Sequence, residues 1–365
     1  MASTLEEARK IINAVDTEMA ELFVKRMQAA EAVAEHKRVH GLEILDPQRE
    51  EELIRRNSAM VDDPVIREYY VNFLKNNMSL SRAYQARLND GMRVAYSGTE
   101  GAFAHIATKR MFPTAVAVAY KSFDEAYAAV VTGECDAAVL PIENSSNGEV
   151  GQVTDLMFSG TLYVNTVSEF AVTHDLLAKA GTRLEDVRTV VSHPQALGQC
   201  HGFIEKHGLA ELEYANTALA AKYVAECEDG SVAAIASAEA AERFGLSVIC
   251  EGINDVGINT TRFAVFTRSM HEHPKKDMGV HSILLFTVRN EAGALAKAID
   301  VIGKHGFNMR TLRSRPMKAL LWQYYFYVEA EGNIGTDEGK AMLAELSTCC
   351  DRLKAVGTYT KLKEA

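Results

Sequence analysis

The stretch Asn259-Thr260-Thr261-Arg262-Phe263-Ala264-Val265-Phe266 decides how the middle of this chain is interpreted. Its last three residues form an apolar run typical of a buried strand, and two hydroxyls and a guanidinium come just before it. Polar groups at a strand end, where a sheet meets a cleft, are where α/β proteins usually hold ligands. A capped strand start with one surface arginine is the alternative, because polar turn residues often flank strands.

Length and composition indicate a globular protein of several domains. The chain has 365 residues, 47% of them hydrophobic and 24% charged, so two or three domains can each bury a core. The acidic start, Met1–Glu7, is not expected to be a signal peptide, and no apolar run reaches the ~18 residues of a membrane span. The six cysteines show no CxxC spacing. We therefore expect a cytoplasmic protein with reduced thiols and no metal site or membrane association.

Charge is distributed unevenly along the chain. Residues 91–270 hold 12 Lys+Arg against 22 Asp+Glu, whereas residues 271–365 hold 14 against 11. The acidic middle would repel polyanions, so nucleic acid is not expected as a partner. A small anionic ligand would need specific guanidinium or backbone N–H groups there.

The first 90 residues predict an all-helical domain. Apolar residues recur at spacings of three and four over residues 5–38, and further helices are expected over 48–59 and 64–87. Asp46 is placed as an N-cap, with Pro47 at the first helical position.

Cations on the first helix form a pattern of their own. Arg26 and Lys37 are 11 residues apart, so they share a face about 16 Å apart and can hold a small dianion between them. Arg9 lies about 25 Å from Arg26 along the axis, so one small ligand cannot touch both from the same helix. Arg9 is therefore expected to serve a site in a partner chain, if it serves a site. Each charge taken singly is more often a solvated surface group.

Together these charges resemble the substrate contacts of the all-helical chorismate mutases. The resemblance covers about 85 residues, although Ser79 competes with Ser81 for one position. It implies an interlocked dimer that rearranges chorismate to prephenate without a cofactor, in which Lys37 and Gln85 stabilise the ether oxygen as its bond breaks. The implied site residues are Arg9, Arg26, Lys37, Asp46, Arg49, Glu50, Ser81 and Gln85.

Residues 91–270 predict two α/β lobes with polar motifs at strand ends. The first lobe contains the glycine turn Gly98–Gly101, which leads into a helix and can seat an anion on backbone N–H groups. Its buried strand 136–140 is expected to end in a loop at 141–148 that forms a cleft wall. The second lobe has a strand over 189–192, a helix over 196–206, a strand near 212–214, a helix from 217 and a strand over 231–235.

Four motifs in these lobes resemble prephenate dehydratase in order and spacing. They are Gly98–Gly101, Pro141–Asn144, Ser192–Gln195 and Thr261–Phe263. The resemblance implies that Thr261 is the essential hydroxyl, which assists departure of the ring hydroxyl as carbon dioxide leaves. It also implies that Arg262 and Gly101 bind carboxylate, and that Asn144, Ser192 and His193 line the cleft. His193 remains open between a general acid and a capping residue.

After a polar linker at 271–279, residues 280–365 predict a βαββαβ, ferredoxin-like domain. The order resembles an ACT regulatory domain. Two of its segments resemble the phenylalanine-binding motifs of dehydratases and imply an effector site at Gly293, Ala294, Leu295, Ser314 and Arg315. A glutamate normally precedes Ser-Arg-Pro in the second motif, and here that place is Arg313. A purely oligomerising domain is the alternative.

The fold expected is therefore multidomain: helical residues 1–90, a two-lobed α/β domain over 91–270 and an α+β domain over 280–365. We expect a bifunctional enzyme of phenylalanine biosynthesis that forms a homodimer or higher oligomer and takes chorismate through prephenate to phenylpyruvate. A ligand sensor that binds prephenate without turning it over is the rival hypothesis, since two-lobed folds serve both roles.

The charge at Arg313 generates a prediction about regulation. If Arg313 occupies the effector pocket, phenylalanine is expected to inhibit weakly or not at all. Dehydratase assays on the intact chain with and without phenylalanine test this, and strong inhibition at micromolar phenylalanine contradicts it.

Overall fold

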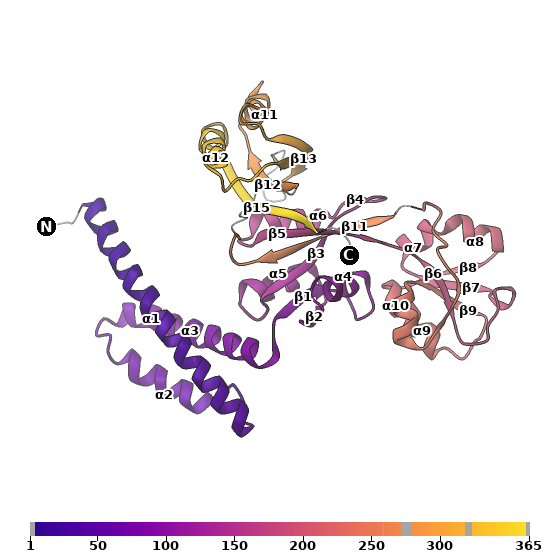
Figure 1. Cartoon of the computed structure of the whole chain (residues 1–365), viewed down its shortest axis with the longest axis horizontal. Coiled ribbons are helices and arrows are strands. Elements are labelled where there is room, and N and C mark those ends of the chain that lie inside the picture. Colours follow the sequence, from indigo (N-terminus) through magenta and orange to yellow (C-terminus); the bar gives the residue numbers. More distant parts are fainter. Residues whose placement is uncertain (1–3, 258, 272–278, 318–322, 363–365) are drawn as a thin grey trace. The chain divides into compact units, whose positions relative to one another are not determined.

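The computed structural model describes residues 4–257, 259–271, 279–317 and 323–362. It divides into two compact units, Met1–Arg93 and Val94–Ala365. Figure 1 shows the three helices of the first unit and the strands and helices of the second. No helix in the described ranges combines the length and the apolar character that a membrane span requires.

The first unit consists of the three predicted helices. They are α1 (Leu5–His40), α2 (Pro47–Ser58) and α3 (Pro64–Asp90). Thr4 and Glu7 form a capping box at the start of α1, and Gly41 ends it in the left-handed conformation. Asp46 and Asp63 cap α2 and α3, each just before a proline at the first helical position.

The buried core of the first unit is small for its length. Its buried apolar residues are Ala30, Ala34, Leu74 and Met78, at the α1–α3 contact. Many large apolar side chains stay exposed on the same helices, among them Ile11, Ile12, Val15, Met19, Leu22, Phe23, Ile66, Tyr69 and Phe73. The periodic stripe on α1 was predicted correctly, but only its C-terminal part packs against α3, and most of its large apolar side chains are exposed among the described residues.

The second unit contains two sheets and three groups of elements. Lobe 1 comprises β1 (Arg93–Ser97), α4 (Phe103–Met111), β2 (Val116–Tyr120), α5 (Phe123–Val131), β3 (Ala137–Asn144), β4 (Gly148–Glu149), α6 (Gly151–Ser159), β5 (Tyr163–Ala171) and β11 (Thr260–Thr267). Lobe 2 comprises β6 (Asp175–Ala178), β7 (Thr189–Ser192), α7 (Pro194–Gln199), α8 (His201–His207), β8 (Ala210–Glu213), α9 (Thr217–Glu226), β9 (Val232–Ala236), α10 (Ala238–Phe244) and β10 (Ser247–Cys250). The C-terminal module comprises β12 (Val280–Thr287), α11 (Ala294–Lys304), β13 (Asn308–Pro316), β14 (Tyr324–Glu331), α12 (Asp337–Cys349) and β15 (Arg352–Leu362).

Lobe 1 and the C-terminal module share one ten-stranded sheet. Its order is β13-β14-β12-β15-β5-β11-β3-β1-β2, and β4 pairs with β3. The strands of the module follow the predicted ferredoxin-like order, with β12 between β14 and β15. Its last strand, β15, lies parallel to β5 of lobe 1, with Thr360 opposite Thr166 (Figure 1). The strands of lobe 1 and of the C-terminal module therefore form one continuous sheet, which was not predicted from the sequence. Residues 272–278 of the expected linker lie outside the described residues.

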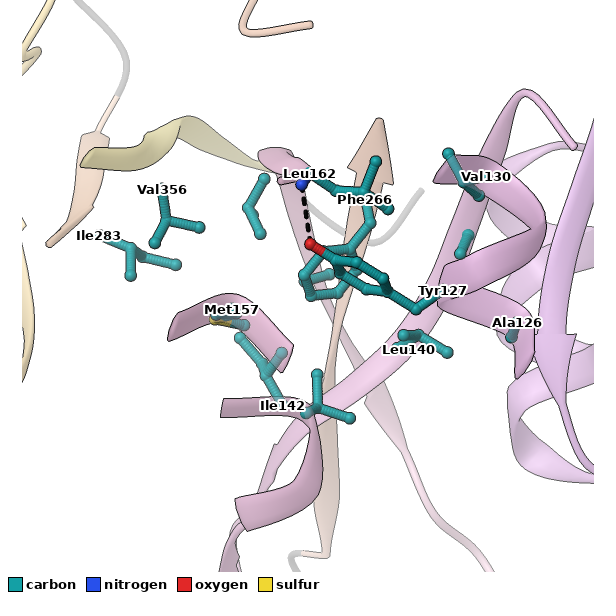
Figure 2. Close-up of a cluster of buried hydrophobic side chains, with 14 of the residues drawn as sticks. Ala126, Tyr127, Val130, Leu140, Ile142, Met157, Leu162, Phe266, Ile283 and Val356 are labelled. Carbon is teal, nitrogen blue, oxygen red and sulfur yellow. Dashed lines mark hydrogen bonds between the residues drawn. The ribbon is translucent and has the colours of Figure 1, made fainter. Parts of the chain in front are cut away.

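One apolar cluster fills both sides of that junction. Leu140 and Phe266 of lobe 1 belong to the same buried cluster as Ile283 and Val356 of the module (Figure 2). Within it, the backbone N–H of Leu162 donates to the hydroxyl of Tyr127 at 2.7 Å, so the buried phenol has a partner.

Lobe 2 is built around a separate five-stranded sheet of order β10-β6-β9-β7-β8. Strand β7 pairs in parallel with both β8 and β9, as the predicted βαβ pattern requires. Apolar clusters cover both faces of this sheet. The chain enters lobe 2 after β5 and returns through the segment before β11 (Figure 1).

Three local expectations are corrected by the structure. Residues 141–144 continue β3 rather than starting a loop, because Pro141 and Glu143 bracket a bulge at Ile142 opposite β11. A bulge accommodates a proline that has no N–H to donate. The helix expected over 196–206 breaks at Cys200, where both carboxylate oxygens of Asp255 accept from the N–H of Gly202 at the start of α8. No element was predicted over 149–188, which holds β4, α6, β5 and β6.

Candidate active sites

In the first unit, a contact between α1 and α3 joins two predicted site residues, Arg26 and Ser81. Arg26 Nη1 donates to the hydroxyl of Ser81 and to the carbonyl of Asn77, the latter at 3.3 Å. Burial lowers the pKa of Arg26, but a guanidinium keeps its charge. Ser81, rather than its competitor Ser79, is therefore the hydroxyl that faces Arg26.

Gln85 lies one turn beyond Ser81 on α3, and both side chains are buried. Its Oε1 has no hydrogen-bond partner within the described part of the chain. A half-turn of the amide exchanges its oxygen and nitrogen, so this buried position can offer a donor as well as an acceptor. The unsatisfied amide oxygen, one turn from the Arg26–Ser81 contact, is available to a polar ligand.

The other predicted mutase residues make local contacts in this structure. Lys37 Nζ donates to the carbonyl of Ile44 at 2.6 Å, and the Asp46 carboxylate caps α2. Arg49 pairs with Glu52 within α2, Glu50 of α2 pairs with Arg82 of α3, and Arg9 is exposed. Arg82 was not predicted as a site residue, although it directly follows Ser81. Its guanidinium bonds to Glu50 of α2 and so brings a positive charge close to that helix.

In lobe 1, Asn144 and Thr261 lie opposite each other on β3 and β11. Asn144 Nδ2 donates to Thr261 Oγ1 at 2.9 Å, and Asn144 Oδ1 accepts from the N–H groups of Ser146 and Asn147, both at 3.0 Å. Those two acceptor contacts fix which end of the amide is nitrogen. Because Asn144 is the donor, the hydroxyl proton of Thr261 remains free for another acceptor.

A chain of buried amides extends from this pair toward lobe 2. Asn144 Nδ2 also donates to Asn259 Oδ1 at 2.9 Å, and Asn259 Nδ2 donates to Gln199 Oε1 at 3.0 Å. His174 Nε2 lies 2.9 Å from the same oxygen of Gln199. Burial lowers the pKa of His174, so its imidazole is neutral near pH 7 and donates from Nε2. Gln199 Oε1 thus accepts from both Asn259 and His174, so the amide nitrogen Nε2 points away from these two residues. This Nε2 is buried and has no hydrogen-bond partner among the described residues.

Gln199 and His174 were missed by the sequence reasoning. Gln199 lies only four residues past the Ser192–Gln195 motif, but it was placed inside an uninterrupted helix. The break at Cys200 is what makes it the last residue of α7. His174 stands in the unassigned segment 149–188, where no periodic pattern marks it.

A cavity of about 510 Å³ opens on the face of the sheet that carries Thr261. Phe170, opposite Thr261 on β5, and Phe263, two residues along β11, line it and contact each other edge to face. Phe103 lines the cavity from α4 and packs its ring against His174. Charged side chains, among them Arg110, Asp175 and Glu251, also line the cavity. Thr261 is not one of the lining residues, but its cross-strand neighbour Phe170 is, so the row of neutral polar groups begins next to the cavity.

Three other predicted dehydratase residues are engaged elsewhere. The N–H of Gly101 donates to His105 Nδ1 at 3.1 Å, and Gly101 packs against Ala218 of α9. The hydroxyl of Ser192 is fully buried and donates to the carbonyl of Ile235. His193 caps α7 by accepting from the N–H of Gln195, which is the capping alternative.

Arg262 lies on the opposite face of β11 from Thr261, as the alternation of a strand requires. Its guanidinium donates to Glu143 at 2.9 Å, to both carboxylate oxygens of Glu329 at 2.9 and 3.0 Å, and to the Tyr359 hydroxyl at 2.7 Å. Burial by itself lowers the pKa of Arg262, but the bonds to Glu329 outweigh this and raise it. The expectation that Arg262 binds a substrate carboxylate is therefore corrected: in this structure it is held by protein carboxylates.

The predicted effector residues are divided between two elements. Gly293 begins α11 with a φ of 83°, followed by Ala294 and Leu295. Arg315, next to Ser314 on β13, bonds to Glu149 and to Asp155 of lobe 1. Arg313 bonds to Glu143 of lobe 1, so the side chain that sets the expectation about phenylalanine points into the junction between module and lobe.

No group of three or more His, Cys, Asp and Glu side chains suited to a metal ion occurs among the described residues. The polar atoms at the Thr261 site are amides and hydroxyls, which act as hydrogen-bond partners.

Comparison with known families gives two matches along the chain. The family described as prephenate dehydratase matches residues 94–271, and the family described as chorismate mutase type II matches residues 8–86. The chain is 31% identical over 366 residues to the bifunctional chorismate mutase/prephenate dehydratase of Neisseria gonorrhoeae, with 98% of this chain and 99% of that protein covered.

Two solved structures resemble the second unit. The prephenate dehydratase of Arthrobacter aurescens in complex with L-Phe is 26% identical, with a TM-score of 0.68, and the alignment covers 74% of this chain and 90% of that one. A protein described as a quorum-quenching acylase, GqqA, is 31% identical with a TM-score of 0.68, over 74% of this chain and 98% of its own.

Proposed function

Because the chain belongs to the family of bifunctional chorismate mutase/prephenate dehydratases, we propose that its two units divide the two reactions between them. The enzyme rearranges chorismate to prephenate and then decarboxylates and dehydrates prephenate to phenylpyruvate, which are steps of phenylalanine biosynthesis. The Arg26–Ser81 site is assigned to the first step and the Thr261–Asn144 site to the second. The observation that carries the second assignment is the hydrogen bond from Asn144 to Thr261, which leaves the threonine proton available.

For dehydration, Thr261 supplies the hydrogen bond that the leaving group needs. The bond from the ring to the carboxylate carbon breaks and releases carbon dioxide, its electron pair enters the ring, and the ring hydroxyl departs as hydroxide, which takes a proton from solvent to become water. The Thr261 O–H is directed at the departing oxygen because its own oxygen already accepts from Asn144. The buried Nε2 of Gln199, oriented by His174 and Asn259, is the proposed donor to a substrate oxygen.

For the rearrangement, the first unit needs only to hold and polarise the substrate. Chorismate carries two carboxylates, and the reaction forms no covalent bond to the protein. Arg26 binds one carboxylate beside Ser81, and the amide of Gln85 bonds to the ether oxygen as its bond breaks. The proposed contact set is completed by Arg9, Lys37, Asp46, Arg49 and Glu50.

Phenylalanine is the proposed effector of the C-terminal module, because the Arthrobacter dehydratase was solved with L-Phe. In this chain both Arg313 and Arg315 are bonded to lobe 1. An effector that contacts β13 would therefore act on a strand already attached to the catalytic lobe. The weak feedback expected from Arg313 stays a prediction, although its side chain lies at the junction.

We further propose that the enzyme is a homodimer or larger oligomer through its first unit. A cavity of about 880 Å³ between α1 and α3 is lined mainly by apolar side chains, among them Met19, Phe23, Tyr70 and Phe73. Together with the exposed α1 stripe it makes an apolar surface larger than a monomer normally leaves in water. A second copy of this helix pair is the occupant whose chemistry matches, since Arg9 then has a site to reach.

The oligomer is tested with Ile12→Glu, which places a charge in the apolar stripe. Sedimentation of the intact chain is expected to show a dimer or larger species in the wild type, dissociation in Ile12→Glu, and loss of mutase activity with dehydratase activity retained. Lys10→Glu is the control, because Lys10 is exposed and pairs with Glu6 on the polar side. A wild-type monomer with full mutase activity contradicts the proposal.

Separate variants test the division of labour. Thr261→Val removes the hydroxyl but keeps the shape, and prephenate turnover is expected to fall by about 10²–10⁴-fold while chorismate turnover is unchanged. Arg26→Met is expected to do the reverse. Both rates are measured on the same purified protein, so each reaction controls for the folding of the other. If Thr261→Val turns over prephenate at the wild-type rate, the assignment of Thr261 as the catalytic hydroxyl is wrong.

A further inference from the structure

The β3–β4 hairpin carries Asn144 at its tip and two glutamates directly opposite each other. Glu143 of β3 pairs in register with Glu149 of β4, and β4 is only two residues long. Like charges placed opposite each other on neighbouring strands destabilise the pair. A hairpin this short has few other contacts with which to compensate, so its conformation depends on what neutralises the two carboxylates.

The neutralising charges come from β13 of the C-terminal module. Arg313 Nη2 bonds to Glu143 Oε1, and Arg315 Nη1 bonds to Glu149 Oε1. The two arginines are two residues apart, so they project from the same face of β13, and each reaches one of the two glutamates. Arg313 also lies 3.9 Å from Glu149, which leaves the four groups as one alternating cluster.

Arg315 is itself held in place by further contacts. Arg315 donates through Nε and Nη2 to Asp155 of α6, both at 3.2 Å, and through Nε to the Tyr325 hydroxyl at 2.9 Å. A Cβ on Gly151, the first residue after the hairpin within α6, would lie 2.5 Å from Arg315 Nη1. The chain leaving the hairpin is thus shaped around this guanidinium.

Glu143 connects the cluster to the catalytic strand. One of its oxygens accepts from Arg313 and the other accepts from Arg262 of β11. The residues that follow Glu143 and precede Arg262 are Asn144 and Thr261, which face each other on the other side of the sheet. A carboxylate held from both sides fixes the end of β3, and with it the position of the Asn144 amide against the Thr261 hydroxyl.

We propose that Arg313 and Arg315 are positioning residues for the dehydratase reaction: they clamp the β3–β4 hairpin by neutralising Glu143 and Glu149, and so hold Asn144 against Thr261. Neither arginine touches the reacting atoms. The clamp belongs to the C-terminal module, so the catalytic pair of lobe 1 is complete only when the module is docked. The inference rests on the proposed assignment of Thr261 and Asn144 to dehydration.

Arg313→Met in the intact chain tests the clamp. Because a displacement of about 1 Å can cost on the order of a hundredfold in rate, the dehydratase kcat is expected to fall by about ten- to a hundredfold. The KM for prephenate is expected to stay within about twofold, since Arg313 does not contact the site. Mutase activity of the same protein is expected to be unchanged.

Two matched variants separate positioning from general damage. Arg310→Met removes a cation from the same strand whose partner, Glu331, lies within the module, and it is expected to keep wild-type dehydratase kcat. Arg313→Lys keeps the charge and is expected to retain at least about half of kcat. Glu149→Gln added to Arg313→Met removes the like-charge pair, so the double variant is expected to recover most of the lost rate.

The clamp is overturned if Arg313→Met keeps wild-type kcat, if Arg310→Met falls equally far, or if Glu149→Gln gives no recovery in the Arg313→Met background. If Thr261→Val dehydrates normally, the assignment of the site fails instead. The two failures are thus distinguishable.

Discussion

The buried charge of Arg262 is the constraint on which the rest of the second unit depends. Its side chain is 14% exposed and its main partner, Glu329, is 4% exposed, so neither charge is solvated by water. Removing one partner from such a pair typically costs about 3–5 kcal/mol, because the other charge stays buried and unpaired. Arg262 belongs to lobe 1, and Glu329 and Tyr359 belong to the C-terminal module. Separating lobe 1 from the C-terminal module would therefore leave the charges of Arg262 and Glu329 without each other, at that cost in free energy.

The alternation of a strand separates chemistry from support across one sheet. Thr261 and Asn144 lie on the sheet face that carries Phe170 beside the cavity, whereas Arg262 and Glu143, their chain neighbours, face the module. A change in the module therefore reaches the catalytic pair through a single peptide unit on each strand. The same sheet also carries the β15–β5 pairing, so module and lobe are joined by backbone as well as by charge.

Sequence reasoning succeeded where a local rule determines the result. Asp46 and Pro47 predicted the start of α2 because capping depends on adjacent residues, and the Thr261–Asn144 pair followed from motifs at two strand ends. It failed where a long-range partner decides. Arg262 looked like a substrate ligand because nothing in its neighbourhood reveals Glu329, 67 residues away. Gln199 was hidden because the break in its helix lies where Gly202 bonds to Asp255, 53 residues further along the chain.

The central claim is that a charge in the C-terminal module supports catalysis in lobe 1, and Glu329→Gln tests it most directly. This substitution keeps the shape of Glu329 and removes the charge that neutralises Arg262, while Glu331→Gln on the same strand changes an exposed carboxylate that pairs within the module. The measurement is dehydratase kcat and KM in the intact enzyme, with mutase activity recorded on the same sample. The account predicts a lower kcat with little change in KM for Glu329→Gln alone, and wild-type kcat in Glu329→Gln would contradict it.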